Sequence, residues 1–163
     1  MKKVYYNETV IGKIGIAEEY GFVTNLYFMN MKQPLDAKVY ETDIIKEAFA
    51  QLNEFLSGSR KDFDLPLNPS GSDFQQMVWS ELLNIGYGEL ITYGEIAENL
   101  RIRSASRAVG GAINKNPVPI IIPCHRVVGA NNDLTGYVGG LDVKKSLLES
   151  EGHVIDNKNF VMP

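Results

Sequence analysis

The sequence predicts an α/β protein (α+β) in which a small antiparallel sheet module with one helix precedes a helical domain. Residues 2–29 are rich in β-branched and aromatic side chains, which favour strands. One amphipathic segment follows, and from residue 72 onward apolar residues recur mostly at helical spacing. The 163 residues, 44% of them hydrophobic, supply enough apolar surface for a packed core.

The first module is expected to be an antiparallel meander followed by a helix. Its strands are separated by polar or glycine-containing turns and are expected over Val4–Tyr6, Ile11–Ala17 and Phe22–Met29. Thr42 or Asp43 can cap a helix that runs to about Ser57, where Gly58 ends it. The apolar residues of this helix near helical spacing are Ile44, Ala48, Phe49, Leu52, Phe55 and Leu56.

Two domains are expected. The stretch 58–71 mixes charged residues with Pro66 and Pro69, a composition typical of a linker. We therefore expect residues 1–70 to form an N-terminal strand-rich module with its linker. Residues 71–163 are expected to form the C-terminal domain.

Helix signals dominate the second domain. Capping boxes pair Ser72 with Gln75 and Thr92 with Glu95. The first of these helices is expected to bury Phe74, Met77, Val78, Trp79, Leu82 and Leu83. The second ends near Leu100, and after a tight turn a third helix covers about 104–114, which gives the outline of a helix-turn-helix. A last helix is expected over about 141–151.

The charge pattern allows one basic face on an acidic protein. The net charge of -4 argues against a broad nucleic-acid surface. Residues 99–132, however, contain no Asp or Glu and carry five cationic residues, which are Arg101, Arg103, Arg107, Lys115 and Arg126. This region is therefore expected to be locally electropositive.

The chain has a single cysteine, Cys124, so an internal disulfide and a multi-cysteine zinc site are both excluded. This composition is typical of a protein that works in a reducing cytoplasm. The longest strongly apolar run, 117–123, is far shorter than the ~20 residues that cross a bilayer, and nothing in the first residues resembles an export signal.

Cys124 is the candidate nucleophile. The thiolate is the reactive form, and His125 and Arg126 beside it in the sequence are cations or potential cations that can lower its pKa. Glu151 stands at a helix end, where a negative charge requires a partner, and orienting His125 would supply one. The alternative is a buried structural cysteine with a hydrogen-bonded structural histidine.

Three further side chains invite both a structural and a functional interpretation. Arg107 is either an exposed helix residue or a side chain that reaches into a DNA groove, since its small neighbours allow close approach. Tyr93 and Tyr137 are either core residues or pocket walls. Adjacent glycines favour the second interpretation.

The segment 122–127, with the sequence IPCHRV, resembles the active-site signature of the O6-alkylguanine-DNA alkyltransferases, also called methylated-DNA-protein-cysteine methyltransferases. The resemblance spans about residues 71–153. Its other motifs, in chain order, are Phe74-Gln75 with Val78-Trp79, Thr92-Tyr93, Arg107-Ala108-Val109-Gly110, Asn116-Pro117-Val118-Pro119, Gly136-Tyr137 with Gly139-Gly140, and Glu151-Gly152-His153. Six collinear signatures are far more specific than one.

The resemblance implies a role for each matching residue. Cys124 would accept the alkyl group from guanine O6, His125 would deprotonate it through a water, and Glu151 would orient His125. Tyr93 would donate a hydrogen bond or proton to the base, and Asn116 would support the active-site turn. The implied substrate pocket contains Tyr137, Val127, Val138, Gly139 and Pro119.

The family binds double-stranded DNA through the minor groove, and Arg107 would fill the gap left by the flipped nucleotide. The other implied DNA-binding residues are Tyr93, Ser106, Ala108, Gly110 and Arg126. O4-alkylthymine is a second candidate lesion. Because an alkyl thioether has no activated carbonyl, the reaction is expected to stop after one transfer. The resemblance also implies a monomer with no cofactor. The metal site that some members of the family hold in the N-terminal module is not expected here, because that module has no cysteine.

Three alternatives remain open. A non-catalytic sensor of alkylated DNA would resemble this family but lack the cysteine. A Cys-His hydrolase would show a burst and then steady turnover on an ester. A plain helix-turn-helix regulator would leave the Cys124 segment and Glu151 unexplained.

Overall fold

The computed structural model describes residues 1–163, which fall into two compact units. The N-terminal unit contains Met1–Ser70 together with Pro117–Ile121. The C-terminal unit contains Gly71–Asn116 and Ile122–Pro163. The mixed α/β class that the sequence predicts is confirmed, with a sheet in the first unit and mainly helices in the second. None of the helices is both long and apolar enough to cross a membrane.

The N-terminal unit is built on a four-stranded sheet of order β3-β2-β1-β4, made of β1 (Lys3–Thr9), β2 (Gly12–Glu19), β3 (Phe22–Phe28) and β4 (Lys38–Val39). The first three strands pair antiparallel, as the expected meander requires, whereas β4 adds in parallel to β1. Tyr20 and Gly21 have φ values of 56° and 82°, and two positive values suit a tight hairpin turn between β2 and β3.

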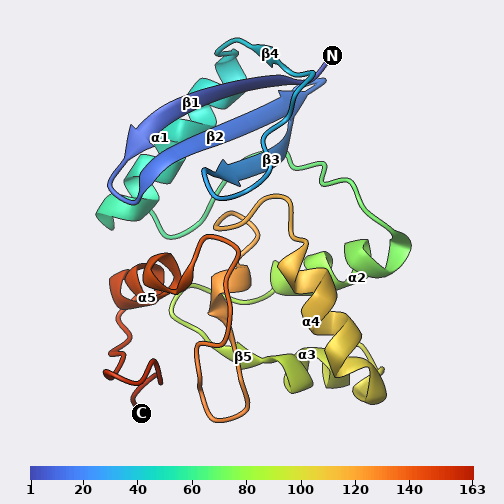
Figure 1. Cartoon of the computed structure of the whole chain (residues 1–163), viewed down its shortest axis with the longest axis vertical. Coiled ribbons are helices and arrows are strands. Elements are labelled where there is room, and N and C mark those ends of the chain that lie inside the picture. Colours follow the sequence, from blue (N-terminus) through green and yellow to red (C-terminus); the bar gives the residue numbers. More distant parts are fainter. The chain divides into compact units, whose positions relative to one another are not determined.

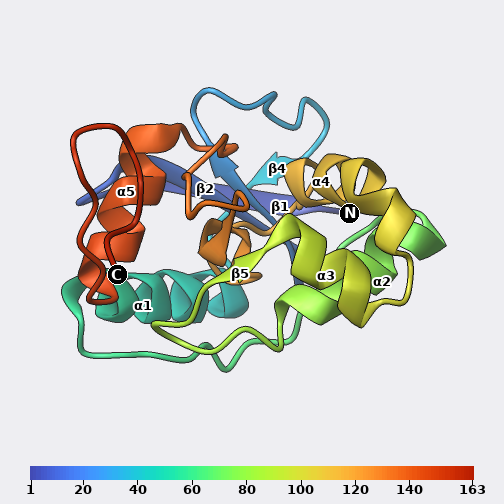
Figure 2. The ribbon, with the colours of Figure 1, turned by 90° about the horizontal axis from the view of Figure 1, so that it is seen from below.

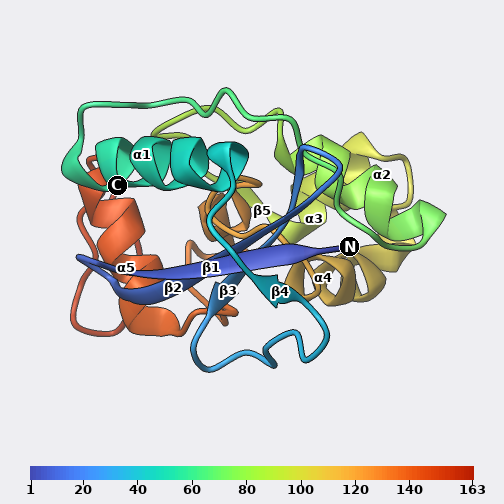
Figure 3. The ribbon, with the colours of Figure 1, turned by 90° about the horizontal axis from the view of Figure 1, so that it is seen from above.

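Helix α1 (Asp43–Ser57) lies along one face of this sheet (Figures 1 and 3). Thr42 caps it by accepting a hydrogen bond from the Ile45 amide, and Gly58 ends it in the left-handed conformation with a φ of 88°. The fully buried position in the first turn is Ile45, with a partly exposed Ile44 beside it. The core-facing residue of this turn is therefore Ile45, and not Ile44 as the apolar spacing indicated.

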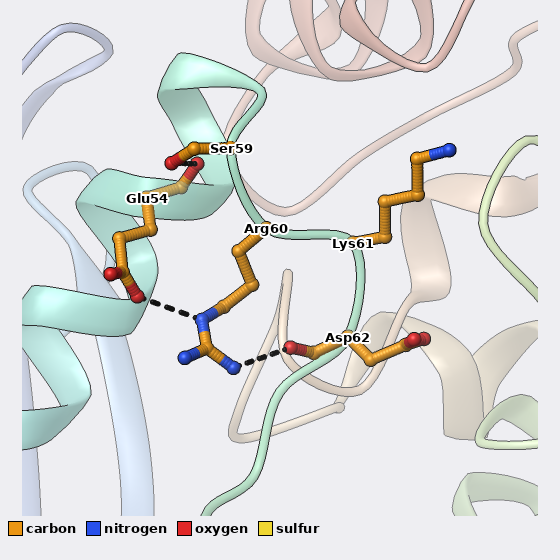
Figure 4. Close-up of a pocket in the computed structure, with 5 residues that line it drawn as sticks. All are labelled: Glu54, Ser59, Arg60, Lys61 and Asp62. Atoms are coloured by element: carbon orange, nitrogen blue, oxygen red, sulfur yellow. Dashed lines mark hydrogen bonds and ion pairs between the residues drawn. The ribbon is translucent and has the colours of Figure 1, made fainter.

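The chain that follows α1 is held to the N-terminal unit. Arg60 pairs with Glu54 at 2.8 Å and donates through Nη1 to the Asp62 carbonyl at 3.0 Å, at a shallow polar pocket (Figure 4). Farther on, the Val23 amide of β3 donates to the Pro66 carbonyl at 2.8 Å. Part of the stretch 58–71 therefore packs on the sheet module instead of forming a free linker.

The C-terminal unit contains four α-helices, two short 3₁₀ helices and one pair of two-residue parallel strands. The helices are α2 (Asp73–Leu82), α3 (Tyr93–Asn99), η1 (Arg103–Ala105), α4 (Ser106–Asn114), η2 (Cys124–Arg126) and α5 (Leu141–Ser150), and the strands are β5 (Ile91–Thr92) and β6 (Val127–Val128). Within this unit, α2, α3 and α4 gather on one side and α5 lies on the other, with β5 between them (Figure 2).

Both expected capping boxes are present, at Ser72 with Gln75 and at Thr92 with Glu95. The buried stripe of α2 is narrower than expected and contains Val78, Trp79 and Leu82. Met77 and Leu83 are 40% and 51% exposed because they lie off this stripe. Trp79 donates through Nε1 to the Ala112 carbonyl at 2.9 Å, which fixes α2 to α4.

A tight turn joins α3 to α4. The Arg101 amide donates to the Glu98 carbonyl and the Ile102 amide donates to the Ala97 carbonyl, the pattern of a Schellman motif. Arg101 itself has a φ of 60°, in the left-handed region that usually selects glycine. The motif stops α3 and lets η1 and α4 follow at once, so that two short helices form the helix-turn-helix outline.

Candidate active site

The candidate nucleophile lies at the start of a 3₁₀ turn in the C-terminal unit. The Cys124 amide donates to the Ile122 carbonyl at 2.7 Å. The residue between them is Pro123, whose ring fixes its φ at -79°. Cys124 is 4% exposed. Asn116 is also buried and donates through Nδ2 to the same Ile122 carbonyl at 2.9 Å. The turn that presents the sulfur is therefore held by both a backbone and a side-chain hydrogen bond.

Burial raises the pKa of the Cys124 thiol to about 11. Hydrogen bonds from Asn116 and Tyr137 and the charge of Lys144 act in the opposite direction but do not outweigh the loss of water. The expectation that neighbouring cations lower this pKa was therefore wrong for the resting protein. At neutral pH the sulfur carries its proton, and a nearby base must take it before the sulfur can attack.

His125, the next residue in the chain, is the candidate for that base. Its Nε2 lies 2.7 Å from Oε2 of Glu151, and both side chains are fully buried. Because the carboxylate can only accept, the neutral imidazole carries its proton on Nε2 and its basic lone pair on Nδ1. Burial lowers the pKa of His125 below its ordinary 6.5, despite the opposing effect of Glu151. The ring is therefore neutral at pH 7 and able to accept a proton.

Glu151 ends α5 and is held by several donors. Arg126 donates through Nε to Oε1 at 2.9 Å and through Nη2 to Oε2 at 3.1 Å, and the Gly88 amide donates to Oε1 at 2.8 Å. Burial by itself would raise the pKa of Glu151, but the hydrogen bonds from His125 and Arg126 bring it down to about 2. The carboxylate therefore stays ionised and can stabilise a positive charge on His125.

Arg126 occupies a different place from the one expected. The resemblance assigns it to the DNA surface, but its side chain is 7% exposed and donates to Glu151 and, through Nη1, to the Ile85 carbonyl at 2.7 Å. Its guanidinium also lies over the Tyr87 ring, 5.8 Å from the centroid. The guanidinium therefore makes its hydrogen bonds inside the protein. Arg126 therefore orients Glu151 and does not present a charge to phosphate.

Tyr93 is the first residue of α3 and is half-buried. Its hydroxyl lies 3.1 Å from Oγ1 of Thr135, and its ring packs beside Gly110 of α4, where an added Cβ would lie 3.7 Å from Cδ1. Burial raises the pKa of Tyr93 above 10.0, although the Thr135 hydrogen bond partly offsets this. The phenol therefore keeps its proton at neutral pH and can act as a donor.

Helix α4 presents three of its four expected DNA-facing residues to solvent, and the fourth, Gly110, is half-buried. Ser106, Arg107 and Ala108 are all exposed. The opposite face of the helix buries Val109, Ala112 and Ile113. No internal hydrogen bond or ion pair fixes the Arg107 side chain, so it is available to an external partner.

Four of the five expected pocket residues lie in the C-terminal unit, and one lies in the N-terminal unit. Val127 of β6 is fully buried, whereas Val138 and Gly139 are half-buried, in the loop before α5. Tyr137 lies in the same loop and hydrogen-bonds the Cys124 thiol. These four residues belong to the same unit as Cys124, but Pro119 belongs to the N-terminal unit.

Lys144, which no sequence motif singles out, is completely buried in α5. Its Nζ donates to the carbonyls of Val127 at 2.7 Å, Gly136 at 3.3 Å and Leu134. Burial lowers its pKa to about 8, and its charge favours the thiolate form of Cys124. Position 144 shares one helix face with 147, 148 and 151, and this spacing was the available signal that the lysine points inward.

Comparison with known proteins adds independent evidence. Residues 1–69 match the ribonuclease-like domain of 6-O-methylguanine DNA methyltransferase, and residues 73–153 match the DNA-binding domain of the same family. A methylated-DNA--protein-cysteine methyltransferase from Methanosarcina acetivorans is 47% identical over 148 residues, which cover 89% of this chain and 95% of the relative. A protein of the same name from Mycobacterium bovis is 42% identical over 146 residues, 88% of each chain.

Solved structures agree with these relatives. A Mycobacterium tuberculosis OGT in complex with DNA superposes with a TM-score of 0.87 at 40% identity, covering 91% of this chain and 92% of that one. An O6-methylguanine DNA methyltransferase from Methanococcus jannaschii gives a TM-score of 0.63 at 30% identity, covering 90% and 92%. The two matched domains together cover most of the chain, and this protein therefore belongs to the 6-O-methylguanine DNA methyltransferase family.

Proposed function

We propose that this protein repairs double-stranded DNA by transferring the alkyl group of O6-alkylguanine to its own Cys124. The observation that carries the proposal is the buried hydrogen-bond series from His125 through Glu151 to Arg126, which begins at the residue directly after the buried Cys124, in a member of this family. The single cysteine of the chain is free, which is in keeping with a reducing cytoplasm, and we include that location in the proposal.

The first step moves the thiol proton. Nδ1 of His125 takes it through a water, and the ionised Glu151 stabilises the imidazolium that forms. Arg126 keeps Glu151 ionised and oriented, so the carboxylate does not compete for the proton. The positive charge of Lys144 stabilises the thiolate for as long as it exists.

The second step is an in-line displacement at the alkyl carbon. The sulfur of Cys124 forms a bond to this carbon as the bond from the carbon to guanine O6 breaks, and the electron pair stays with the base. Tyr93 donates a hydrogen bond or proton to the base as its negative charge develops, which its protonated state allows. The products are an S-alkyl cysteine and an unmodified guanine.

Access to the lesion requires base flipping, because the O6 substituent cannot be reached within the duplex. Helix α4 would lie in the minor groove, and Arg107 would fill the space left in the stack. The exposed Ser106 and Ala108 have small side chains beside Arg107, which supports close approach to the DNA. We extend the same pocket to O4-alkylthymine as a second lesion.

The reaction is expected to stop after one transfer, since a thioether has no activated carbonyl for water to attack. Incubating the protein with duplex DNA that contains labelled O6-methylguanine should transfer about one methyl group per chain. Peptide mass spectrometry should locate it on Cys124. Many product molecules per chain, or steady turnover of an ester, would contradict this proposal and favour a Cys-His hydrolase.

The rate of methyl transfer should fall at acid pH. The pKa of His125 is lowered below 6.5, so the neutral base is present at pH 7 and is lost only as the pH falls through that lowered value. Glu151, with a pKa of about 2, stays ionised throughout this range. We expect a plateau from pH 7 to about 8 in single-turnover measurements, and a decline above it as Lys144, whose pKa is about 8, loses the charge that stabilises the thiolate. A tenfold rise per pH unit across that interval would show instead that hydroxide removes the thiol proton without His125.

Replacing Arg107 with alanine should slow repair of duplex DNA about tenfold or more, because unstacking a base costs a few kcal/mol and Arg107 offsets part of it. Reaction with free O6-methylguanine should be nearly unchanged, since no base has to be flipped. The charge-conserving Arg107→Lys variant should be intermediate, because lysine lacks the planar guanidinium. Equal losses on both substrates would remove Arg107 from the flipping role.

A further inference from the structure

Thr135 occupies an unusual place in the loop before α5. Its φ of 55° lies in the left-handed region, where a β-branched residue is rare. The conformation is held by the Thr135 amide, which donates to Oδ1 of Asp133 at 3.1 Å. Strained backbone of this kind persists only where the surroundings fix it, and it directs the Thr135 hydroxyl toward Tyr93.

The contacts of this hydroxyl settle which group donates. Oγ1 of Thr135 lies 2.6 Å from the Leu134 carbonyl, which can only accept, so the single hydroxyl hydrogen of Thr135 points at Leu134. The contact of 3.1 Å between Thr135 and Tyr93 must then be donated by the phenol. In the resting protein the Tyr93 proton is therefore directed at Thr135.

The Leu134 carbonyl has a second donor. Nζ of Lys144 also donates to it, and Lys144 is completely buried. If the Thr135 hydrogen turns away, this carbonyl remains satisfied. Thr135 can thus donate either to Leu134 or to the phenol oxygen without leaving a buried acceptor unpaired.

We propose that Thr135 is a positioning residue for Tyr93, acting as a two-state hydrogen-bond partner. Before the base enters, Thr135 accepts from the phenol and fixes its oxygen. When Tyr93 turns its proton toward the base, the Thr135 hydroxyl swings from Leu134 to the phenol oxygen and stabilises the negative charge that develops there. Tyr93 is held in place in both states. The proton that the phenol gives to the base is balanced by the thiol proton that His125 has taken, so the net charge of the protein does not change.

This inference rests on the proposed alkyl transfer, and its test begins with the wild-type protein. Single-turnover rates on O6-methylguanine duplex are compared for wild type, Thr135→Val, Thr135→Ser, Tyr93→Phe and the double variant that combines Thr135→Val with Tyr93→Phe. Valine keeps the shape and the β-branch, and Lys144 still satisfies Leu134 in the valine variant, so the loop should stay folded. Denaturant unfolding of each variant verifies this.

Thr135→Val should react about tenfold more slowly than wild type, and Thr135→Ser should stay within about threefold. In the Tyr93→Phe background, Thr135→Val should change the rate by less than about twofold, because its effect is exerted through the phenol. An equal effect of Thr135→Val in both backgrounds, or no effect in wild type, overturns the inference. Failure of the wild type to label Cys124 would instead refute the proposed function.

Discussion

A Cys124→Ser variant is expected to bind methylated duplex DNA and to accept no alkyl group. The hydroxyl is a much weaker nucleophile than the thiolate at neutral pH, and loss of a covalent nucleophile lowers rates by more than about 10⁴-fold in other enzymes. Serine can keep the hydrogen bonds that Asn116 and Tyr137 make to the sulfur. The free energy of unfolding should therefore change by no more than about 2 kcal/mol.

The measurement is transfer of a labelled methyl group, with DNA binding followed separately by fluorescence anisotropy. Cys124→Ala is the matched control, because it removes the nucleophile without adding a hydroxyl. Both variants should bind like wild type and remain unlabelled. Label on the serine variant would place the acceptor elsewhere. A wild type that binds but stays unlabelled would favour the non-catalytic sensor.

Glu151→Gln should reduce both stability and activity. The carboxylate is completely buried and accepts from His125, Arg126 and Gly88. A neutral amide leaves the buried Arg126 guanidinium without a counter-charge, and breaking a buried ion pair in this way costs about 3–5 kcal/mol. The amide can also offer a donor to His125, which would reverse the tautomer and place the proton on Nδ1. Methyl transfer should slow about 10²-fold or more.

Glu149→Gln is the matched control, since Glu149 is an exposed residue near the same end of α5. It removes the same charge, and its free energy of unfolding should lie within about 0.5 kcal/mol of wild type. Urea unfolding and single-turnover rates measure the two variants side by side. If Glu151→Gln resembles Glu149→Gln in both measurements, the buried network contributes neither stability nor catalysis.

Helix starts that depend on neighbouring residues could be predicted from the sequence. The capping boxes at Ser72 and Thr92, and the cap at Thr42, depend on residues three positions apart, so the helix starts are correct. The apolar faces were less accurate. The element packed against a helix decides which of its apolar residues are buried, such as Ile45 and not Ile44, or whether Met77 faces the core. The helical periodicity of the sequence does not specify that element.

The candidate site shows the same division. The motif around Cys124 and the resemblance of the chain to its family were visible in the residues themselves. The inward turn of Arg126, the burial of Lys144 and the contact of Thr135 with Tyr93 were not, because each joins side chains distant in the sequence. Sequence adjacency to His125 and Arg126 even predicted the wrong direction for the pKa of Cys124.

The sequence by itself determined the family, the order of the α-helices and of the three antiparallel strands, and the candidate nucleophile, because these follow from residue type and short spacing. The tertiary structure decided the protonation states and the hydrogen-bond partners. Both depend on how much water and which charges surround a side chain once the chain has folded. Burial protonates Cys124 at rest, and the donors around Glu151 keep it ionised.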